Sequence, residues 1–214
     1  NVLPIDDRSG ERLNPDVAGR PELVKGDNQV LFPGMVRLSE HALINTKNKS
    51  HSVTAELTVP EGGAEGTIIA QGGNFGGWAV YANNGKLKYA YNLLGLDLFE
   101  VESPDPIPSG VVQVQMDFDY DGGGLGKGGT ASLYVDGTKV ADGRVDATHP
   151  MIVSADSTAS VAEKGGAPIS DDFNRTGKNA FSGRVHWVNI TVGDDSHDHY
   201  IDDEERVRIA MSLQ

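Results

Sequence analysis

The chain of 214 residues carries 31 acidic and 18 basic side chains, a formal net charge of −13, and no cysteine. This charge disfavours binding to nucleic acid and to anionic membranes, which select basic surfaces, and no apolar run approaches the ~20 residues of a membrane span. The lack of cysteine excludes disulfides and thiolate zinc sites, but leaves the redox compartment undetermined. The 27 glycines separate short alternating segments, which indicates an antiparallel all-β sandwich.

The N-terminal segment, residues 1–28, has no hydrophobic periodicity. It contains Pro4, Pro15 and Pro21 among charged side chains, so we expect an extended arm or linker. The chain begins with neither Met nor a signal-peptide pattern, which indicates a fragment of a longer polypeptide.

Alternating apolar and polar side chains predict a β-sandwich domain over residues 29–193. In residues 111–120, VVQVQMDFDY, every second side chain from Val112 to Tyr120 is apolar. Asn83-Asn84-Gly85 and Asp136-Gly137 predict hairpin turns, because Asn, Asp and Gly tolerate positive φ. The polar residues 155–180 predict a long irregular excursion. The predicted strands are 29–32, 52–59, 66–71, 77–83, 86–93, 111–120, 130–135, 138–145 and 182–192.

The C-terminal segment, residues 194–214, is expected to form an acidic linker and a short helix over 202–213. Acidic side chains open this helix, and Asp202 and Arg206 have the i,i+4 spacing of a helical ion pair. The acids lack the spacing of an EF-hand. His197 and His199 form an i,i+2 pair that could bind a transition metal, although such a pair in an acidic segment is more typical of solvated side chains.

Several segments resemble laminin-G and concanavalin-like jelly rolls. They are GGWAVYANNGKLKYAYN, the strand–turn–strand LYVDGTKVADG, and the closing FSGRVHWVNI. The resemblance implies a jelly-roll β-sandwich and does not by itself imply a function.

A second resemblance extends over most of the chain. Seven motifs, in order, are similar to the C-terminal extension of large bacterial arylsulfatases: NVLPIDDR, ERLNPDVAGRPEL, LFPGM, NTKNKSHSVTAE, AQGGNFGGWAVY, KYAYN and YDGGGLGKGGT. The resemblance implies a non-catalytic accessory domain that packs on the catalytic sulfatase domain of the same chain, near the substrate approach. The parent enzyme would need a formylglycine and a divalent cation.

No catalytic residue is predicted in the chain itself. It has no Cys, and no Ser in a Ser-x-Pro-x-Arg stretch that could become formylglycine. Glu100-Val101-Glu102 comes nearest to the paired acids of a jelly-roll glycosidase, but Ser103-Pro104-Asp105 is expected to end the strand there. No serine triad can be identified.

Two alternatives to docking remain open, a carbohydrate-binding module that recruits sulfated glycans and an oligomerising domain. The candidate contact residues are Trp78 and Phe75 in the glycine-rich GGNFGGW, and Lys127 in the next glycine-rich loop. Flat aromatic rings can stack on sugar faces, and the glycines around Trp78 favour a place at the surface. Tyr89 and Tyr91 are expected to face the core.

The glycine-rich stretch YDGGGLGKGG, from Tyr120 to Gly129, is a hairpin connection. It cannot be a Walker phosphate loop, because Gly126-Lys127 is followed by glycine and then by a strand. Asp119 and Asp121 lie at its mouth and could bind calcium together with turn carbonyls. The alternative is a structural loop that packs against the partner domain.

Overall fold

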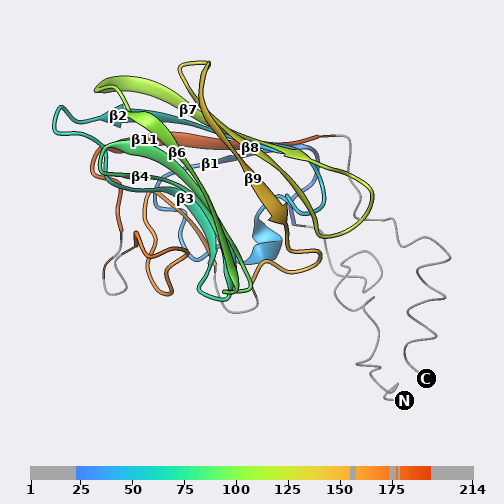
Figure 1. The fold of residues 1–214 in the computed structure, drawn as a ribbon. Helices are drawn as coiled ribbons and strands as arrows, with labels where there is room; N and C mark the ends of the chain where they lie inside the picture. The colour runs from blue at the N-terminus through green and yellow to red at the C-terminus, as the bar shows by residue number, and fades with distance from the viewer. Residues whose placement is uncertain (1–22, 155–157, 174–176, 178, 194–214) are drawn as a thin grey trace, which may run out of the picture.

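The computed structural model describes residues 23–154, 158–173, 177 and 179–193, which form two β-sheets packed face to face (Figure 1). The strand order is β1-β11-β2-β7-β8-β9 in the six-stranded sheet and β10-β3-β4-β5-β6 in the five-stranded sheet. Neighbouring strands pair antiparallel in both. The predicted all-β antiparallel sandwich is confirmed.

The strands are named in chain order. The six-stranded sheet contains β1 (Asn28–Leu31), β2 (His51–Val59), β7 (Gly110–Tyr120), β8 (Lys127–Val135), β9 (Thr138–Ala147) and β11 (Arg184–Val192). The five-stranded sheet contains β3 (Gly66–Gly73), β4 (Gly76–Asn83), β5 (Lys86–Leu93), β6 (Asp97–Pro106) and β10 (Ala159–Val161). A 3₁₀ turn, Glu40–Ala42, is the helical segment of the described residues.

The alternating sequences place one face of each central strand in the core. In β2 every second side chain is buried, from His51 to Val59, and Ala55 lies opposite Val114 of β7. The predicted strands 52–59 and 111–120 are confirmed. At the predicted turns, Asn84 and Gly85 have φ of 52° and 80°, and Asp136 and Gly137 have φ of 46° and 75°, as two-residue hairpins require.

Two strands differ from the sequence prediction. The strand that was expected to end after Glu102 continues through Pro104 and Pro106 as part of β6. Proline is tolerated there because β6 is the edge strand of its sheet, where fewer backbone donors need a partner. The excursion 155–180 contains the short strand β10, which carries no recognisable sequence pattern.

The prediction of a surface position for Trp78 is wrong. Its side chain is 2% exposed and lies in the core between the sheets, opposite Tyr91 of β5. The indole Nε1 donates a hydrogen bond to Gln71 Oε1 at 2.9 Å. The neighbouring glycines are needed for close strand contact, since a Cβ on Gly77 would lie 2.8 Å from the nitrogen of Gly73. Tyr89 and Tyr91 are buried, as predicted.

Several predictions fall outside the described residues. They concern the helix at 202–213, the pair His197 and His199, and most of the arm 1–28. In the part of the chain that the structure describes, no helix is long and apolar enough to span a membrane.

Exchange of Trp78 for alanine tests its place in the core. We expect Trp78→Ala to lower the free energy of unfolding by about 3–5 kcal/mol, because it removes a large buried side chain. The control Phe75→Ala removes an aromatic side chain that is 74% exposed, and should change stability by no more than about 0.5 kcal/mol. Urea unfolding monitored by circular dichroism measures both. Equal, small effects would show that Trp78 is not a core residue.

Candidate functional site

Two hairpin turns meet at one end of the five-stranded sheet. The β3–β4 turn contains Asn74 and Phe75, and the β5–β6 turn contains Leu94, Gly95 and Leu96. They lie side by side because β4 and β5 are neighbours. The contact is close, since a Cβ on Gly95 would lie 2.7 Å from the carbonyl oxygen of Asn74. Glycine is therefore required where the turns touch.

A cavity of about 190 Å³ opens beside these turns, on the outward face of the five-stranded sheet. Its floor includes Asn92 and Leu98, which are register partners on β5 and β6. One wall comes from the hairpin turns, and the other comes from residues 168–171, far along the chain. The lining residues are Asn74, Asn92, Gly95, Leu96, Asp97, Leu98, Pro168, Ile169, Ser170 and Asp171.

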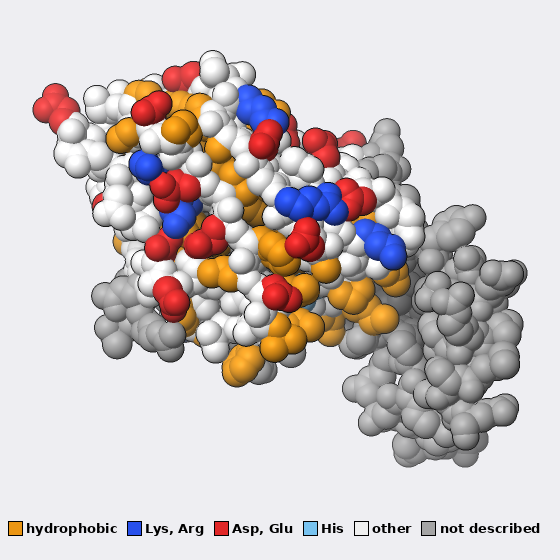
Figure 2. Space-filling model, viewed as in Figure 1, with side chains coloured by type: hydrophobic (Ala, Val, Ile, Leu, Met, Phe, Trp, Pro, Cys, Tyr) orange, Lys and Arg blue, Asp and Glu red, His pale blue; other side chains and the backbone are white. Residues whose placement is uncertain are grey.

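The two hairpin turns beside the cavity carry exposed apolar side chains. Leu96 and Leu98 line the cavity and are 81% and 44% exposed, and Phe75 and Leu94, on the same turns, are 74% and 56% exposed. Figure 2 shows hydrophobic side chains gathered along the lower edge of the molecule, where Figure 1 places the lower ends of the strands of this sheet. An apolar group of this kind beside polar groups is typical of a contact surface.

The β5–β6 turn has a strained backbone. Leu94 and Gly95 have φ of 57° and 71°, and the amide of Leu96 donates to the carbonyl of Leu93 at 2.9 Å. Such turns favour Asn at the first position, whereas a leucine pays steric strain in the left-handed region. Strained, exposed residues concentrate at ligand sites, so this leucine marks the turn as a functional candidate.

Asn92 ties the three parts of the site together. Its Oδ1 accepts the amide of Gly95 at 2.8 Å, and its Nδ2 donates to the carbonyl of Ile169 at 2.9 Å. Asn74, Asp97 and Asp171 are exposed where they line the cavity. The site therefore combines a fixed amide and two carboxylates, with the exposed Phe75 on the neighbouring turn.

The loop that supplies the second wall is packed onto the sheet. Ile169 and Phe173 are buried against the outward face, and the rings of Tyr81 and Phe173 lie 4.8 Å apart between centroids. The small side chains of the sheet give them room. This second hydrophobic cluster consists of Ala70, Ala79, Tyr81, Ala90, Ile169 and Phe173.

An ion pair between the sheet and the loop fixes the same loop, with Lys88 buried and the Asp172 carboxylate partly exposed. Lys88 Nζ lies 2.5 Å from Asp172 Oδ2, and the Tyr81 hydroxyl donates to the same oxygen at 2.6 Å. Partial burial alone would raise the pKa of Asp172, but the hydrogen bonds from Lys88 and Tyr81 lower it below its usual value. Burial together with Asp172 raises the pKa of Tyr81 far above its ordinary value, so Tyr81 stays protonated.

Two glutamates of β6 add to this ion pair. Lys88 Nζ lies 3.7 Å from Glu100 Oε1 and 3.6 Å from Glu102 Oε2. Burial alone would lower the pKa of Lys88, but Asp172 and these glutamates raise it above its ordinary value. Lys88 therefore keeps its charge, and the group serves as an anchor for the loop.

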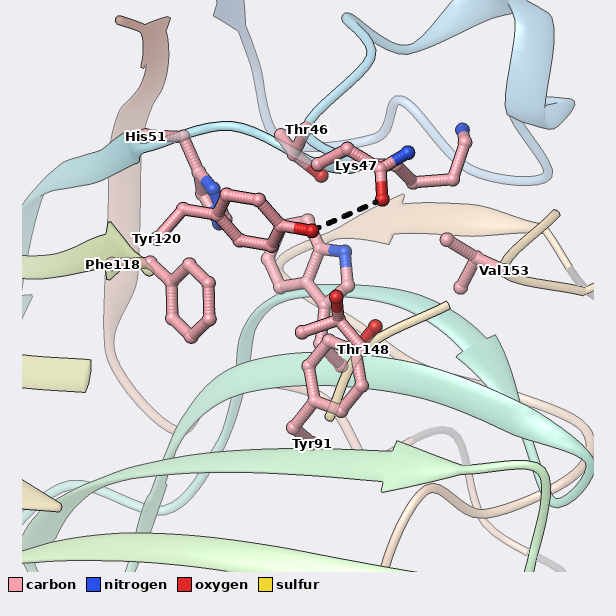
Figure 3. A pocket seen from close by; sticks show the side chains of 10 residues that line it. Thr46, Lys47, His51, Tyr91, Phe118, Tyr120, Thr148 and Val153 are labelled. Carbon is pink, nitrogen blue, oxygen red and sulfur yellow. Dashed lines mark hydrogen bonds between the residues drawn. The ribbon is translucent and has the colours of Figure 1, made fainter. Parts of the chain in front are cut away.

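A second, smaller cavity lies inside the sandwich and is lined by aromatic rings (Figure 3). Its volume of about 10 Å³ leaves room for about one water. The labelled Tyr91, Phe118 and Tyr120 point into it, and the dashed line joins the Tyr120 hydroxyl to Asn48 Oδ1 at 3.5 Å. Nearby, burial lowers the pKa of His149. This cavity is a packing feature and is too small for an organic ligand.

The glycine-rich loop between β7 and β8 does not bring its predicted residues, Asp119, Asp121 and Lys127, to the cavity at the hairpin tips. Arg144 forms a bidentate pair with Asp121, which lowers the pKa of Asp121. Asp119 is exposed opposite Thr130 on the six-stranded sheet, and Lys127 is exposed at the start of β8. The described residues contain no group of three acidic or histidine side chains that could hold a metal. Calcium at Asp119 and Asp121 would have to displace Arg144 and stays a prediction.

The hydroxyl of Tyr120 organises the same loop from within. It donates to the carbonyl of Gly124 at 2.6 Å and accepts the amide of Lys127 at 2.8 Å. These hydrogen bonds take the place of backbone hydrogen bonds between β7 and β8 at the point where the two strands separate. The loop therefore has an internal structural role.

The outward face of the six-stranded sheet is a second exposed surface. A β-bulge between Val185 and Trp187 places the half-buried Trp187 opposite Glu56. Its neighbours are mostly amides and hydroxyls, such as Gln113, which donates to Glu56 at 3.5 Å. This face is polar, and neither of the two cavities described above lies on it.

Of the predicted contact residues, the structure places Phe75 alone at the hairpin tips. The sequence gives no prediction for four residues that line the cavity, which are Asn92, Asp97, Ser170 and Asp171. One signal was available. The run LLGLDL, residues 93–98, puts four leucines around a glycine turn, where solvated polar residues are usual.

No protein-family model matches the chain, and no curated protein matches it in sequence. Its fold is similar to that of the Ruminococcus gnavus IT-sialidase CBM40 bound to α2,3-sialyllactose (TM-score 0.50, 12% identity, 82% of this chain and 96% of that chain). A second similar structure is that of mouse laminin α1 domains LG4-5, with a TM-score of 0.45 and 14% identity over 82% of this chain and 41% of that chain. A third is a SAP-like pentraxin from Limulus polyphemus, with a TM-score of 0.38 and 15% identity over 77% of this chain and 73% of that chain.

These likenesses concern the class of fold. The chain is a two-sheet antiparallel sandwich, and its likeness to the CBM40 domain concerns this fold alone. None of the comparisons tests the resemblance to arylsulfatase extensions, which stays a prediction.

Replacement of Asp172 tests the loop anchor. Because its folded pKa is lowered, the stability that Asp172 contributes is present above its unfolded pKa and is lost as pH falls through the folded pKa. We expect Asp172→Asn to be less stable at pH 7 by about 1 kcal/mol, because solvent weakens the partly exposed ion pair, and the difference to shrink as pH falls through the lowered folded pKa of Asp172. Urea unfolding at a series of pH values measures it.

The control is Asp119→Asn, which removes an exposed carboxylate that lies outside the loop anchor. Its stability should follow the wild type at every pH. A difference between Asp172→Asn and the wild type that does not change with pH would contradict the role given to the carboxylate.

Proposed function

We propose that the domain is a carbohydrate-binding module and that the cavity at the hairpin tips holds the sugar. The observation that carries the proposal is the exposed ring of Phe75 beside a cavity lined by an amide and two carboxylates. Sugars present hydroxyl groups at their edges and apolar C–H groups on their faces. Fixed polar groups inside an otherwise apolar rim suit both.

The size of the cavity limits what it can take. Its volume of about 190 Å³ is below the roughly 300–1,000 Å³ of sites for drug-sized molecules. A single terminal sugar of a glycan fits this scale better than a longer segment. The remaining sugars would pass over the exposed leucines of the rim.

The similarity of fold is consistent with a glycan-binding function but does not by itself imply one. The CBM40 domain with the similar fold binds sialyllactose, so a sandwich of this kind can present a glycan site. At 12% identity the likeness carries no residue from one site to the other. The proposal for this chain rests on its own cavity.

Docking within a larger enzyme is a second candidate function. Exposed apolar side chains lie in and just after β1 and in the loop after β9. They are Val30, Phe32, Met35, Val36, Met151 and Ile152. An accessory domain of an arylsulfatase would need such a surface, and it would leave the hairpin tips available for a glycan. We propose that the isolated domain has no sulfatase activity of its own.

Exchange of Phe75 tests the proposed sugar site. A glycan array of neutral, amino and anionic sugars first selects the tightest ligand, and calorimetry then compares the variants with it. We expect Phe75→Ala to weaken binding at least tenfold, about 1.4 kcal/mol, because the stacking face is lost. The matched control Phe32→Ala removes a ring that is 50% exposed, and should bind as the wild type does. Equal affinities of all three proteins would refute the site, and no binding on the array would refute the proposed function.

A further inference from the structure

His149 lies directly beneath the hairpin that carries Phe75. It comes from the loop after β9, and its side chain is 1% exposed. Gly76, which follows Phe75 and begins β4, faces the imidazole ring, because a Cβ on Gly76 would lie 2.5 Å from His149 Nε2. The ring therefore fills the space that the glycine leaves, and a change in the ring acts directly on the β3–β4 turn.

The same ring is tied to the second hairpin of the cavity. His149 Nδ1 lies 2.8 Å from the hydroxyl oxygen of Tyr91 on β5, and this hydroxyl also accepts the backbone amide of His149 at 2.8 Å. Asn92, the next residue of β5, lines the cavity and accepts the amide of Gly95 in the β5–β6 turn. One buried side chain therefore supports both hairpins that border the proposed site.

These contacts favour the neutral form of the ring. Burial raises the pKa of Tyr91, so its hydroxyl keeps a hydrogen. Because this hydroxyl accepts the amide of His149, its own hydrogen is directed at Nδ1, where a proton on the ring would compete with it. Among the described residues, His149 Nε2 has no hydrogen-bond partner. An imidazolium ring would therefore be buried with no acceptor for its second N–H group.

The charged groups around the ring do not offset its burial. Burial lowers the pKa of His149 below its ordinary value, Glu40 acts in the opposite direction, and Lys47 adds to the lowering. Glu40 and Lys47 are paired at 2.8 Å, so their effects on the ring oppose each other. Two further titratable side chains, His51 and Tyr120, line the small internal cavity nearby. The closed structure therefore resists a proton that an exposed histidine would accept.

We infer that protonation of His149 loosens the hairpins at the cavity, so that the proposed glycan site binds near neutral pH and is weakened in mild acid. The inference rests on the proposed function and adds its regulation. Local opening at the tips lets the ring reach water and take up a proton. Because the pKa of the ring is lowered in the closed structure, the closed form is fully favoured above the ordinary histidine pKa of about 6.5. This advantage is lost as pH falls from there toward the lowered pKa.

Hydrogen exchange of the domain without a ligand tests the effect on the hairpin. We expect peptides that cover residues 72–78 and 148–153 to exchange about tenfold faster at pH 5.0 than at pH 7.5, after correction for the intrinsic rates, because the open form binds the proton more tightly. Peptides from β2 and β7 should keep their protection. At pH 5.0 most carboxylates stay ionised, since their ordinary pKa values are about 4.

Variants assign the effect to one histidine. His149→Asn keeps an oxygen that can accept the Tyr91 hydroxyl but cannot titrate in this range, so its protection should be the same at both pH values. His186→Asn removes an imidazole that contacts Thr58 on the other sheet, and should behave as the wild type does. His51→Asn should also keep the pH dependence. If His149→Asn does not fold, the imidazole signals of wild-type His149 decide by nuclear magnetic resonance, and should titrate below pH 6.5, the ordinary value of about 6.5 being that of an exposed ring.

Calorimetry at the two pH values links the hairpin to binding. With the glycan that the array selects, we expect about threefold weaker binding at pH 5.0, because only the closed fraction binds, and no such change in His149→Asn. If no glycan binds at either pH, the proposed function fails, whatever the exchange shows. If a glycan binds equally at both pH values, or if the pH dependence survives in His149→Asn or is lost in His51→Asn, the glycan site stands and the inference is wrong. Titration of His149 above pH 6.5 would also overturn it.

Discussion

The ion pair of Lys88 and Asp172 is the interaction on which the candidate site depends. Without it, the five-stranded sheet would present two bare hairpins, because the wall at 168–171 is held in place by the neighbouring side chains of the loop. The buried ammonium group of Lys88 needs a partner for its charge. Asp172 supplies it and also accepts a hydrogen bond from Tyr81, while Ile169 and Phe173 of the same loop are buried with Tyr81 on the outward face of the sheet.

The anchored loop changes what the hairpin tips can do. Three segments that are far apart in the chain converge on one cavity, and Asn92 connects them through its amide. The strained Leu94 and the exposed Phe75 would be liabilities in a domain without a partner. If the proposed site binds a glycan, the hydrogen bonds that hold its turns and loop together would form it before the ligand arrives, which would reduce the entropic cost of binding.

Local pattern in the sequence predicts most of the fold but little of the site. The alternation of apolar and polar side chains predicts β2 and β7, and Asn84-Gly85 predicts the hairpin between β4 and β5, because these signals depend only on neighbours in the chain. The prediction for Trp78 is wrong because glycines beside an aromatic residue are typical of an exposed loop. Here these glycines instead allow close contact between β3 and β4. The cavity was missed because it depends on the packing of residues 168–171 against β5 and β6, which no local pattern encodes.

The most direct test of the account is a map of the bound glycan on the ¹⁵N-labelled domain by nuclear magnetic resonance. If the hairpin tips bind the glycan, the amide signals of Gly95, Asp97 and Ser170 shift as the ligand is added, while those of the six-stranded sheet stay in place. Shifts centred on Trp187 and Glu56, with none at the hairpin tips, would contradict it and would place the binding surface on the opposite sheet.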